Sequence, residues 1–326
     1  MTENQLKKKG RPSRLRLYIA PALLLLLSLA FSVGWVFVSN RVEAHLDRLI
    51  ADEASKGRLW SCGARKFAGF PFRIEVECLD ARLKVTNEPN FDVKLPRMIA
   101  VAQIYDPSLV IVEADGPLSA AQSDKPIISA SWTTLRSSLH MQADRMPDRL
   151  ALVSEGLKIK YEARGQSAAM TKGELHLRVK PADKTPTNDL EFAVQAEALS
   201  SDMMPGAPAN FETAGIFEQG IEFLKFKGPE TIDIWRRANG RLILQSFLVS
   251  RGDQSLDLKG TLGLDEQRRL TGQIEFAGKG LDDFFKSAGF SKFSALQTAS
   301  VKVPLIFVNG YLLLGPFKMA ELRPLY

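Results

Sequence analysis

The sequence lacks the short motifs that mark common enzymes and nucleotide-binding proteins. It contains no G-x-S-x-G, H-E-x-x-H, Walker A, G-x-G-x-x-G or C-x-x-C segment. Histidine is scarce, with only His45, His140 and His176, and we expect His176 to be solvated because it lies on the polar side of an alternating segment. We therefore predict a protein that is not an enzyme, with no catalytic residues, no metal site and no cofactor. A Ser/His/Asp group that meets only in the folded chain stays open, because its members need not be close in sequence.

The folded part of the chain also lacks an excess of positive charge, although the pI is about 9.2. Residues 1–16 contain six of the 43 basic residues and one acidic residue, and residues 17–39 carry no charge. Residues 40–326 hold 37 basic and 36 acidic residues. A nucleic-acid surface needs clustered Lys and Arg, so we predict no nucleic-acid partner.

One long apolar segment runs from Leu17 to Ser39, 23 residues whose only ionisable side chain is Tyr18. As a helix it would span about 34 Å, enough to cross a bilayer. Tyr18 and Trp35 lie near its two ends, where aromatic rings prefer the headgroup level. We predict an uncleaved transmembrane helix at 17–39. The basic tail at 1–16 stays in the cytoplasm, and the main domain lies on the other side of the membrane.

A cleaved signal peptide is the alternative for this segment. Its apolar region would be about 7–15 residues long, followed by a small-x-small cleavage site. Val42-Glu43-Ala44 could imitate such a site, but Arg41 and Glu43 are unfavourable there. The length of the apolar segment therefore favours an anchor.

The chain has two cysteines, Cys62 and Cys78, separated by 16 positions in the part predicted to lie outside the cytoplasm. In an oxidising compartment such a pair can form a disulfide, which we predict. Two free buried thiols are the alternative. A metal site is disfavoured because no histidine lies near the pair in sequence.

The hydrophobic period changes at Gly57. Residues 40–56 predict a juxtamembrane helix, with apolar positions at helical spacing and Gly57 as its stop. Later segments alternate between apolar and polar residues, namely Phe72–Cys78, Leu157–Tyr161, Leu175–Val179, Leu190–Ala198 and Leu256–Leu264. Such alternation predicts antiparallel strands with one apolar face. We therefore predict a β-rich domain over 57–326.

Turn signals divide this region further. Asn239-Gly240 and Asn309-Gly310 predict two-residue hairpins, because both central residues of a type I′ turn need positive φ. Residues 241–277 predict a three-stranded meander. The remaining expectations are short helices and loops, namely helices at 230–238 and 281–288 and loops at 181–188 and 202–210.

Two stretches of the sequence resemble a known family. The first runs from Trp60-Ser-Cys62-Gly through Gly69-Phe-Pro71-Phe-Arg73-Ile-Glu75-Val-Glu-Cys78. The second is Val303-Pro304-Leu-Ile-Phe-Val-Asn309-Gly310 with Leu314-Gly315-Pro316-Phe and Pro324-Leu-Tyr326. Over residues 57–326 the chain resembles the bacterial domain of unknown function 2125 family. The resemblance implies an inner-membrane anchor and a periplasmic domain with paired cysteines and a G-[FY]-P-F-R motif; it implies no activity.

The motif Gly69-Phe70-Pro71-Phe72-Arg73 also has a physical interpretation. Glycine permits a bend, and proline fixes φ at the start of the following strand. We predict a structural role in which one phenylalanine anchors in the core. A binding role is the alternative.

Residues 252–265 show a weaker resemblance to AsmA-like proteins, which are membrane-anchored, β-rich envelope proteins implicated in handling lipids. Taken together, we predict a mainly β fold in which the transmembrane helix precedes a large, curved antiparallel sheet with a few short helices, an AsmA-like half-barrel or sandwich. This domain would bind or transfer lipid or another hydrophobic ligand along its apolar face, with Leu256, Leu258, Leu262 and Leu264 as candidate lining residues. The alternative is a non-catalytic scaffold that docks other envelope proteins. An open groove of several hundred cubic ångströms would favour the carrier, and a packed core would favour the scaffold.

Overall fold

A single long helix precedes the sheet. The computed structural model describes residues 15–86, 90–142, 147–180, 188–225, 230–280 and 302–326. Helix α1 (Leu15–Ser55) joins the two predicted N-terminal helical segments into one, and it is long and apolar enough to cross a membrane. It ends where Gly57 adopts φ +80° and donates its N–H to the carbonyl of Ala54 at 3.0 Å, a helix end that favours glycine.

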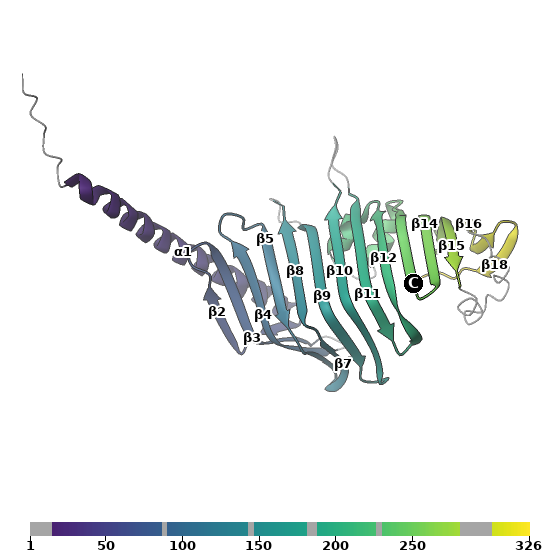
Figure 1. The fold of residues 1–326 in the computed structure, drawn as a ribbon, viewed down its shortest axis with the longest axis horizontal. Coiled ribbons are helices and arrows are strands. Elements are labelled where there is room, and N and C mark those ends of the chain that lie inside the picture. The colour runs from purple at the N-terminus through teal and green to yellow at the C-terminus, as the bar shows by residue number, and fades with distance from the viewer. Residues whose placement is uncertain (1–14, 87–89, 143–146, 181–187, 226–229, 281–301) are drawn as a thin grey trace, which may run out of the picture.

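The described strands form one antiparallel sheet, with two short helices beside it (Figure 1). The first strands are β1 (Arg58–Ser61), β2 (Ala64–Ala68), β3 (Arg73–Val85), β4 (Phe91–Gln103), β5 (Leu109–Asp115), β6 (Leu118–Gln122), β7 (Lys125–Ser131), β8 (Thr134–Met141) and β9 (Pro147–Tyr161). The others are β10 (Gln166–Val179), β11 (Leu190–Ser201), β12 (Met204–Phe217), β13 (Leu242–Arg251), β14 (Gln254–Leu264), β15 (Leu270–Lys279), β16 (Val303–Val308), β17 (Tyr311–Leu314) and β18 (Phe317–Glu321). The short helices are η1 (Gly220–Lys225) and α2 (Glu230–Arg237). The predicted mainly β fold with a large antiparallel sheet is confirmed.

The strands follow one another as a meander. From β9 to β18 each strand pairs with the next strand in sequence. Two long strands lie between β4 and β9, and each is interrupted once. One consists of β5 and β6, separated at Gly116-Pro117, and the other consists of β7 and β8, separated at Trp132-Thr133. At the other edge, β1 and β2 pair with opposite ends of β3.

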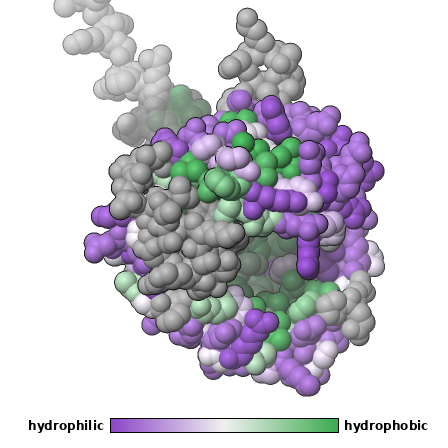
Figure 2. Space-filling model, turned by 90° about the vertical axis from the view of Figure 1, so that its right-hand side faces the viewer, coloured by the Kyte–Doolittle hydropathy of each residue, from purple (hydrophilic) through white to green (hydrophobic). Residues whose placement is uncertain are grey.

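Irregular positions bend the strands. Asp80, Gly156 and Ala198 have positive φ inside β3, β9 and β11, and the register shifts between Leu244 and Phe247 in β13. A bulge bends its strand and increases the local twist. Viewed from the end of the sheet that is on the right in Figure 1, the molecule has a recess near its centre (Figure 2).

The register places apolar residues on one face of the sheet from β3 to β17. Residues directly opposite each other in an antiparallel pair point to the same side. One continuous row across the ladder consists of Ile74, Ala102, Val110, Leu139, Leu150, Leu177, Phe192, Gly215, Leu244, Gly260, Ile274, Leu305 and Leu314. The two-residue alternation of the sequence therefore becomes a single long apolar surface.

Two parts of this surface carry helices, one at β2 and β3 and the other at β12. Arg65 of β2 lies opposite Cys78 of β3 and bonds Asp47 of α1 at 2.7 Å, so the second half of α1 lies over the apolar side. Further along, Phe217 of β12 lies 6.2 Å from the ring of Trp235 in α2. The described helices thus cover only parts of the apolar face.

Several local predictions are confirmed. Asn309 and Gly310 have φ +51° and +80° and connect β16 to β17 as a two-residue hairpin. The helix expected at 230–238 is α2, and the expected meander is β13–β15. The helix expected at 281–288 and most of the loop expected at 181–188 lie outside the described residues.

The hairpin predicted at Asn239-Gly240 is wrong. These residues end α2: Asn239 has φ +54°, and Gly240 donates its N–H to the carbonyl of Trp235 at 2.9 Å. Asparagine with positive φ fits a helix end as well as a type I′ turn, so the dipeptide alone does not distinguish them.

The loop predicted at 202–210 is also wrong, because β12 begins at Met204. Its first part pairs irregularly with β11, and β13 pairs with β12 only from Asn210 onward. Pro205 and Pro208 therefore stand where no hydrogen bond to β13 is needed, a position that tolerates proline in a sheet.

Glycine at position 260 allows β14 and β15 to approach closely, which gives a test of the fold. Gly260 has φ +155°, and a Cβ there would lie 2.2 Å from the carbonyl oxygen of Gln273. We expect Gly260→Ala to lower the free energy of unfolding by about 2 kcal/mol. Gly263→Ala is the matched control, because a Cβ at Gly263 meets nothing closer than 3.6 Å. Urea denaturation measures both variants, and equal stability of the two would contradict the described register.

Candidate functional site

The candidate site is the apolar concave face of β3–β17, which we call the trough. Few of its side chains are fully covered. In the described part of the chain the buried apolar residues are Ile74, Cys78, Ala81, Ala130, Leu190, Trp235, Leu244 and Ile274. Most apolar positions of the trough are only half-buried.

Two cavities lie along the sheet. One of 640 Å³ spans β11–β14. Four residues of its lining lie on the apolar face, namely Ala196, Phe211, Val249 and Leu256, and the other eight, Glu212 and Leu248 among them, alternate with these and lie on the opposite face. Another of 380 Å³ lies at β6, β7, β9 and β10 and includes Ile159. In the end-on view the recess is visible at the centre of the molecule, with apolar residues on its walls (Figure 2).

The predicted lining residues fall on this face. Leu256, Leu258 and Leu262 lie opposite Val249, Phe247 and Leu242 in the ladder, and all three are half-buried. Leu264 continues the alternation at the end of β14, opposite Leu270. Leu256 also lines the larger cavity. The structure brings these leucines together, and their contact with a ligand stays a prediction.

Sequence reasoning missed the contributions of neighbouring strands to the same surface. Phe247 lies opposite Leu258 on one side, and Phe276 lies opposite it on the other. Phe192 and Ile274 belong to the row described above. The signal was present in the alternation of β11 and β15, but only the register shows that these alternating segments share one face.

An aromatic cluster covers one part of the trough. Phe217 stacks near Phe192 at 4.9 Å and near Phe223 of η1 at 5.2 Å. Trp235 of α2 adds a ring 5.9 Å from Phe223 and donates its indole N–H to the carbonyl of Glu218 at 2.8 Å. Leu190 beneath the cluster is 2% exposed. This is the best-packed part of the apolar face in the described residues.

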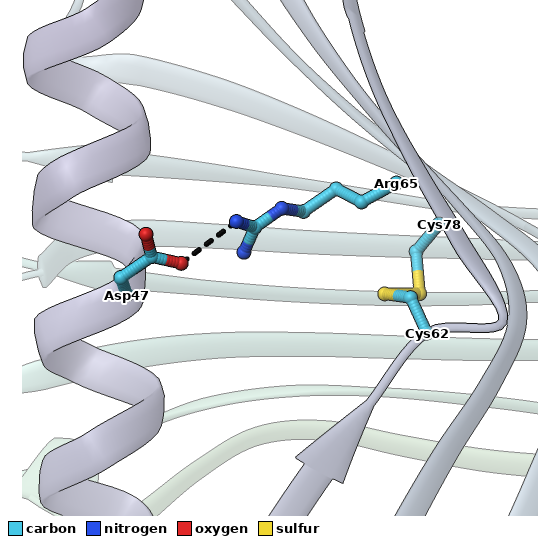
Figure 3. Close-up of a disulfide and its surroundings, with 4 residues drawn as sticks. All are labelled: Asp47, Cys62, Arg65 and Cys78. Carbon is cyan, nitrogen blue, oxygen red and sulfur yellow. Dashed lines mark hydrogen bonds and ion pairs between the residues drawn. A yellow bond between two sulfur atoms is a disulfide. The ribbon is translucent and has the colours of Figure 1, made fainter.

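The disulfide lies at the other end, beside α1 (Figure 3). Cys62 follows β1, Cys78 lies in β3, and their Cα atoms are 5.4 Å apart. The prediction of a Cys62–Cys78 disulfide is confirmed. Next to it Arg65 reaches across to Asp47 of α1, so the crosslink stiffens the part of the sheet that carries the helix.

A further ion pair fixes the end of α1. The Arg58 guanidinium of β1 bonds both carboxylate oxygens of Glu53, one of them at 2.7 Å. These hydrogen bonds from Arg58 lower the pKa of Glu53 to about 2. The carboxylate is therefore charged at every physiological pH, and the link between helix and sheet does not depend on pH in that range.

The motif at 69–73 departs from its predicted packing. Gly69 has φ +98°, and a Cβ there would lie 2.7 Å from the carbonyl oxygen of Arg73, so the glycine is required by the bend. Phe70 and Phe72 are 55% and 64% exposed, so the prediction that one of them anchors in the core is wrong. Both rings contact α1 instead. The sequence of the motif does not show whether these two rings pack in a core or against α1.

A Ser/His/Asp chain does form in the folded protein. His140 Nδ1 lies 2.6 Å from Asp148 Oδ1, and its Nε2 lies 3.3 Å from the Ser108 hydroxyl. The Ser108 hydroxyl, however, donates its hydrogen bond to Asp106 at 2.5 Å. In a catalytic triad the serine donates to histidine. The described arrangement ties the β4–β5 loop to β8 and β9 and does not activate Ser108.

The other polar groups show no assembled chemistry among the described residues. His176 is solvent-exposed, as its strand position predicts, and lies 3.3 Å from Glu174. No described group of three or more His, Cys, Asp or Glu side chains is placed to hold a metal ion. The absence of a cofactor and of an enzymatic activity stays a prediction.

Comparison with known proteins gives one match. The model of a family described as an uncharacterized protein conserved in bacteria, DUF2125, matches residues 35–323. The chain belongs to the DUF2125 family. The match includes both cysteines, the motif at 69–73 and nearly all of the sheet, so the predicted family resemblance is confirmed. No curated protein and no solved structure matches the DUF2125 chain, and the likeness to AsmA-like proteins stays a prediction.

The disulfide of this DUF2125 protein gives a second test. Because the crosslink closes a 16-residue separation, we expect Cys62→Ala/Cys78→Ala to lose on the order of 3 kcal/mol of unfolding free energy in the chain-entropy model. Dithiothreitol should produce a similar loss in the natural chain and none in the double variant. Urea denaturation of both proteins, with and without the reductant, measures it. An equal response of the two proteins to the reductant would contradict the crosslink.

Proposed function

We propose that this protein is a membrane-anchored periplasmic protein of the cell envelope that binds or transfers lipid, or another elongated hydrophobic ligand, along the trough. The observation that carries the proposal is the continuous apolar row from β3 to β17, which the described helices cover only in part. A soluble monomer rarely exposes a large contiguous apolar surface unless something binds to it.

The location is supported by independent features. Residues 17–39 carry no charge and lie within one long helix. The basic residues precede that segment, which favours a cytoplasmic N-terminus and a domain on the opposite side. A disulfide between Cys62 and Cys78 fits the oxidising periplasm better than the cytoplasm. The inner membrane is therefore the first partner we propose.

The shape of the site favours a carrier over a scaffold. A scaffold that merely docks envelope proteins needs a stable domain with a closed core, whereas the leucines and phenylalanines of the trough are only half-buried. Acyl chains need no hydrogen-bond partners, so a surface of Leu, Val and Phe suffices to hold them. Envelope proteins remain the alternative partners, and a trough that binds no hydrophobic probe would favour them.

A paired substitution on neighbouring residues tests the trough directly. Leu258 points into the trough, whereas Gln273 of the adjacent strand β15 lies on the opposite face and is exposed. We expect Leu258→Asp to weaken binding of the fluorescent fatty acid cis-parinaric acid by at least about tenfold, because a carboxylate against an acyl chain is desolvated without a partner. Gln273→Asp, which adds the same charge on the other face, should leave the affinity unchanged.

Fluorescence titration of the full chain in detergent measures both variants, with circular dichroism to confirm that each is folded. Binding of the probe by neither the natural chain nor the variants would contradict lipid binding. Equal loss in both variants would place the binding surface elsewhere.

A further inference from the structure

Three exposed aromatic residues lie together at one end of the sheet. Phe70 and Phe72 belong to the β2–β3 loop, and Tyr105 belongs to the β4–β5 loop. The two loops are neighbours, because Ile104 donates its N–H to the carbonyl of Phe72 at 3.0 Å. Phe70, Phe72 and Tyr105 are 55%, 64% and 74% exposed, and we call them the aromatic rim. A group of exposed apolar rings is typical of a surface that contacts a membrane or another protein.

The aromatic rim lies against the apolar part of α1. The Phe72 ring is 5.9 Å from the Phe31 ring, and the Phe70 ring is 5.7 Å from Trp35. Trp35 also donates its indole N–H to the carbonyl of Arg73 at 3.0 Å, just after the loop. Ring contacts and a hydrogen bond therefore hold the loop beside the segment that carries no charge.

The position of these contacts along α1 gives their depth in the proposed membrane. Trp35 follows Tyr18 by 17 residues, a rise of about 26 Å, which is close to the roughly 30 Å thickness of a hydrocarbon core. With Tyr18 at one interface, Trp35 lies at the other, and Phe31 lies about 6 Å deeper. Arg41, the first charged residue beyond, lies about 9 Å outward from Trp35, at the level of the headgroups. The rings that touch Phe31 and Trp35 stand at the same depth.

We propose that the aromatic rim inserts into the membrane leaflet on the side of the sheet, so that the domain is seated on the bilayer and not merely tethered to it. The inference rests on the proposed role of α1 as a membrane anchor. Burying the rings of Phe70 and Phe72 in the bilayer is favourable because it removes apolar surface from water, and tyrosine favours the interface because its hydroxyl stays hydrated. The trough begins at β3, the strand that follows Phe72, so its end lies at the bilayer surface.

Photo-crosslinking in proteoliposomes tests this placement. The photoreactive residue p-benzoylphenylalanine is introduced separately at the positions of Phe70, Phe72 and Tyr105 in the full chain, reconstituted in phosphatidylethanolamine and phosphatidylglycerol vesicles. Phe317 of β18 is the matched control, since it is 68% exposed at the far end of the sheet. Phe247 in the trough reports separately on ligand binding. Each substitution exchanges one aromatic ring for another and so preserves the fold.

We expect mass spectrometry to find lipid adducts at Phe70 and Phe72 at least tenfold more often than at Phe317, and adducts at Tyr105 as well. No excess over Phe317, or adducts only to protein, would overturn the proposal. Carbonate extraction of the same vesicles checks the anchor: release of the chain would overturn both the anchor and the insertion. Adducts at the rim without adducts at Phe247 would support the insertion and count against lipid in the trough.

Discussion

An antiparallel sheet with one continuous apolar face must place that face against something apolar. Here the constraint acts along the whole trough, because the register aligns apolar residues from Ile74 to Leu314 on one side. The second half of α1 covers one part, and the cluster around Trp235 covers another. The curvature produced by the bulges brings the remaining apolar walls toward each other without closing them. The contacts of α1 and α2 with the sheet lie where parts of this face are covered.

The same constraint bears on how a ligand would move. Each methylene removed from water contributes about 0.8 kcal/mol, but a lipid that arrives from a bilayer is already out of water. The free energy of its transfer from the bilayer into an apolar trough is then close to zero, which suits reversible loading and release. Aromatic residues seated in the bilayer would spare the lipid a passage through water. The ion pair of Glu53 with Arg58 keeps helix and sheet together over the physiological pH range, so the first strands of the sheet stay beside α1.

The hydrophobic period and the turn residues of the sequence predicted much of the fold. Alternation around Leu258 predicted a strand with one apolar face, and Asn309-Gly310 predicted its hairpin. Asn239-Gly240 misled because positive φ serves a helix end equally well. Alternation also cannot show what an apolar face meets, so the exposure of Phe72 and the openness of the trough needed the three-dimensional structure. The His140–Asp148 pair likewise depends on strand pairing that no local pattern reveals.

We propose that the trough holds a hydrophobic molecule, and native mass spectrometry of the full chain, extracted gently from bacterial membranes, tests this. We expect a bound lipid mass that survives mild detergent exchange. A chain that is consistently free of lipid, and that does not take up lipid when phospholipid is supplied, would contradict it.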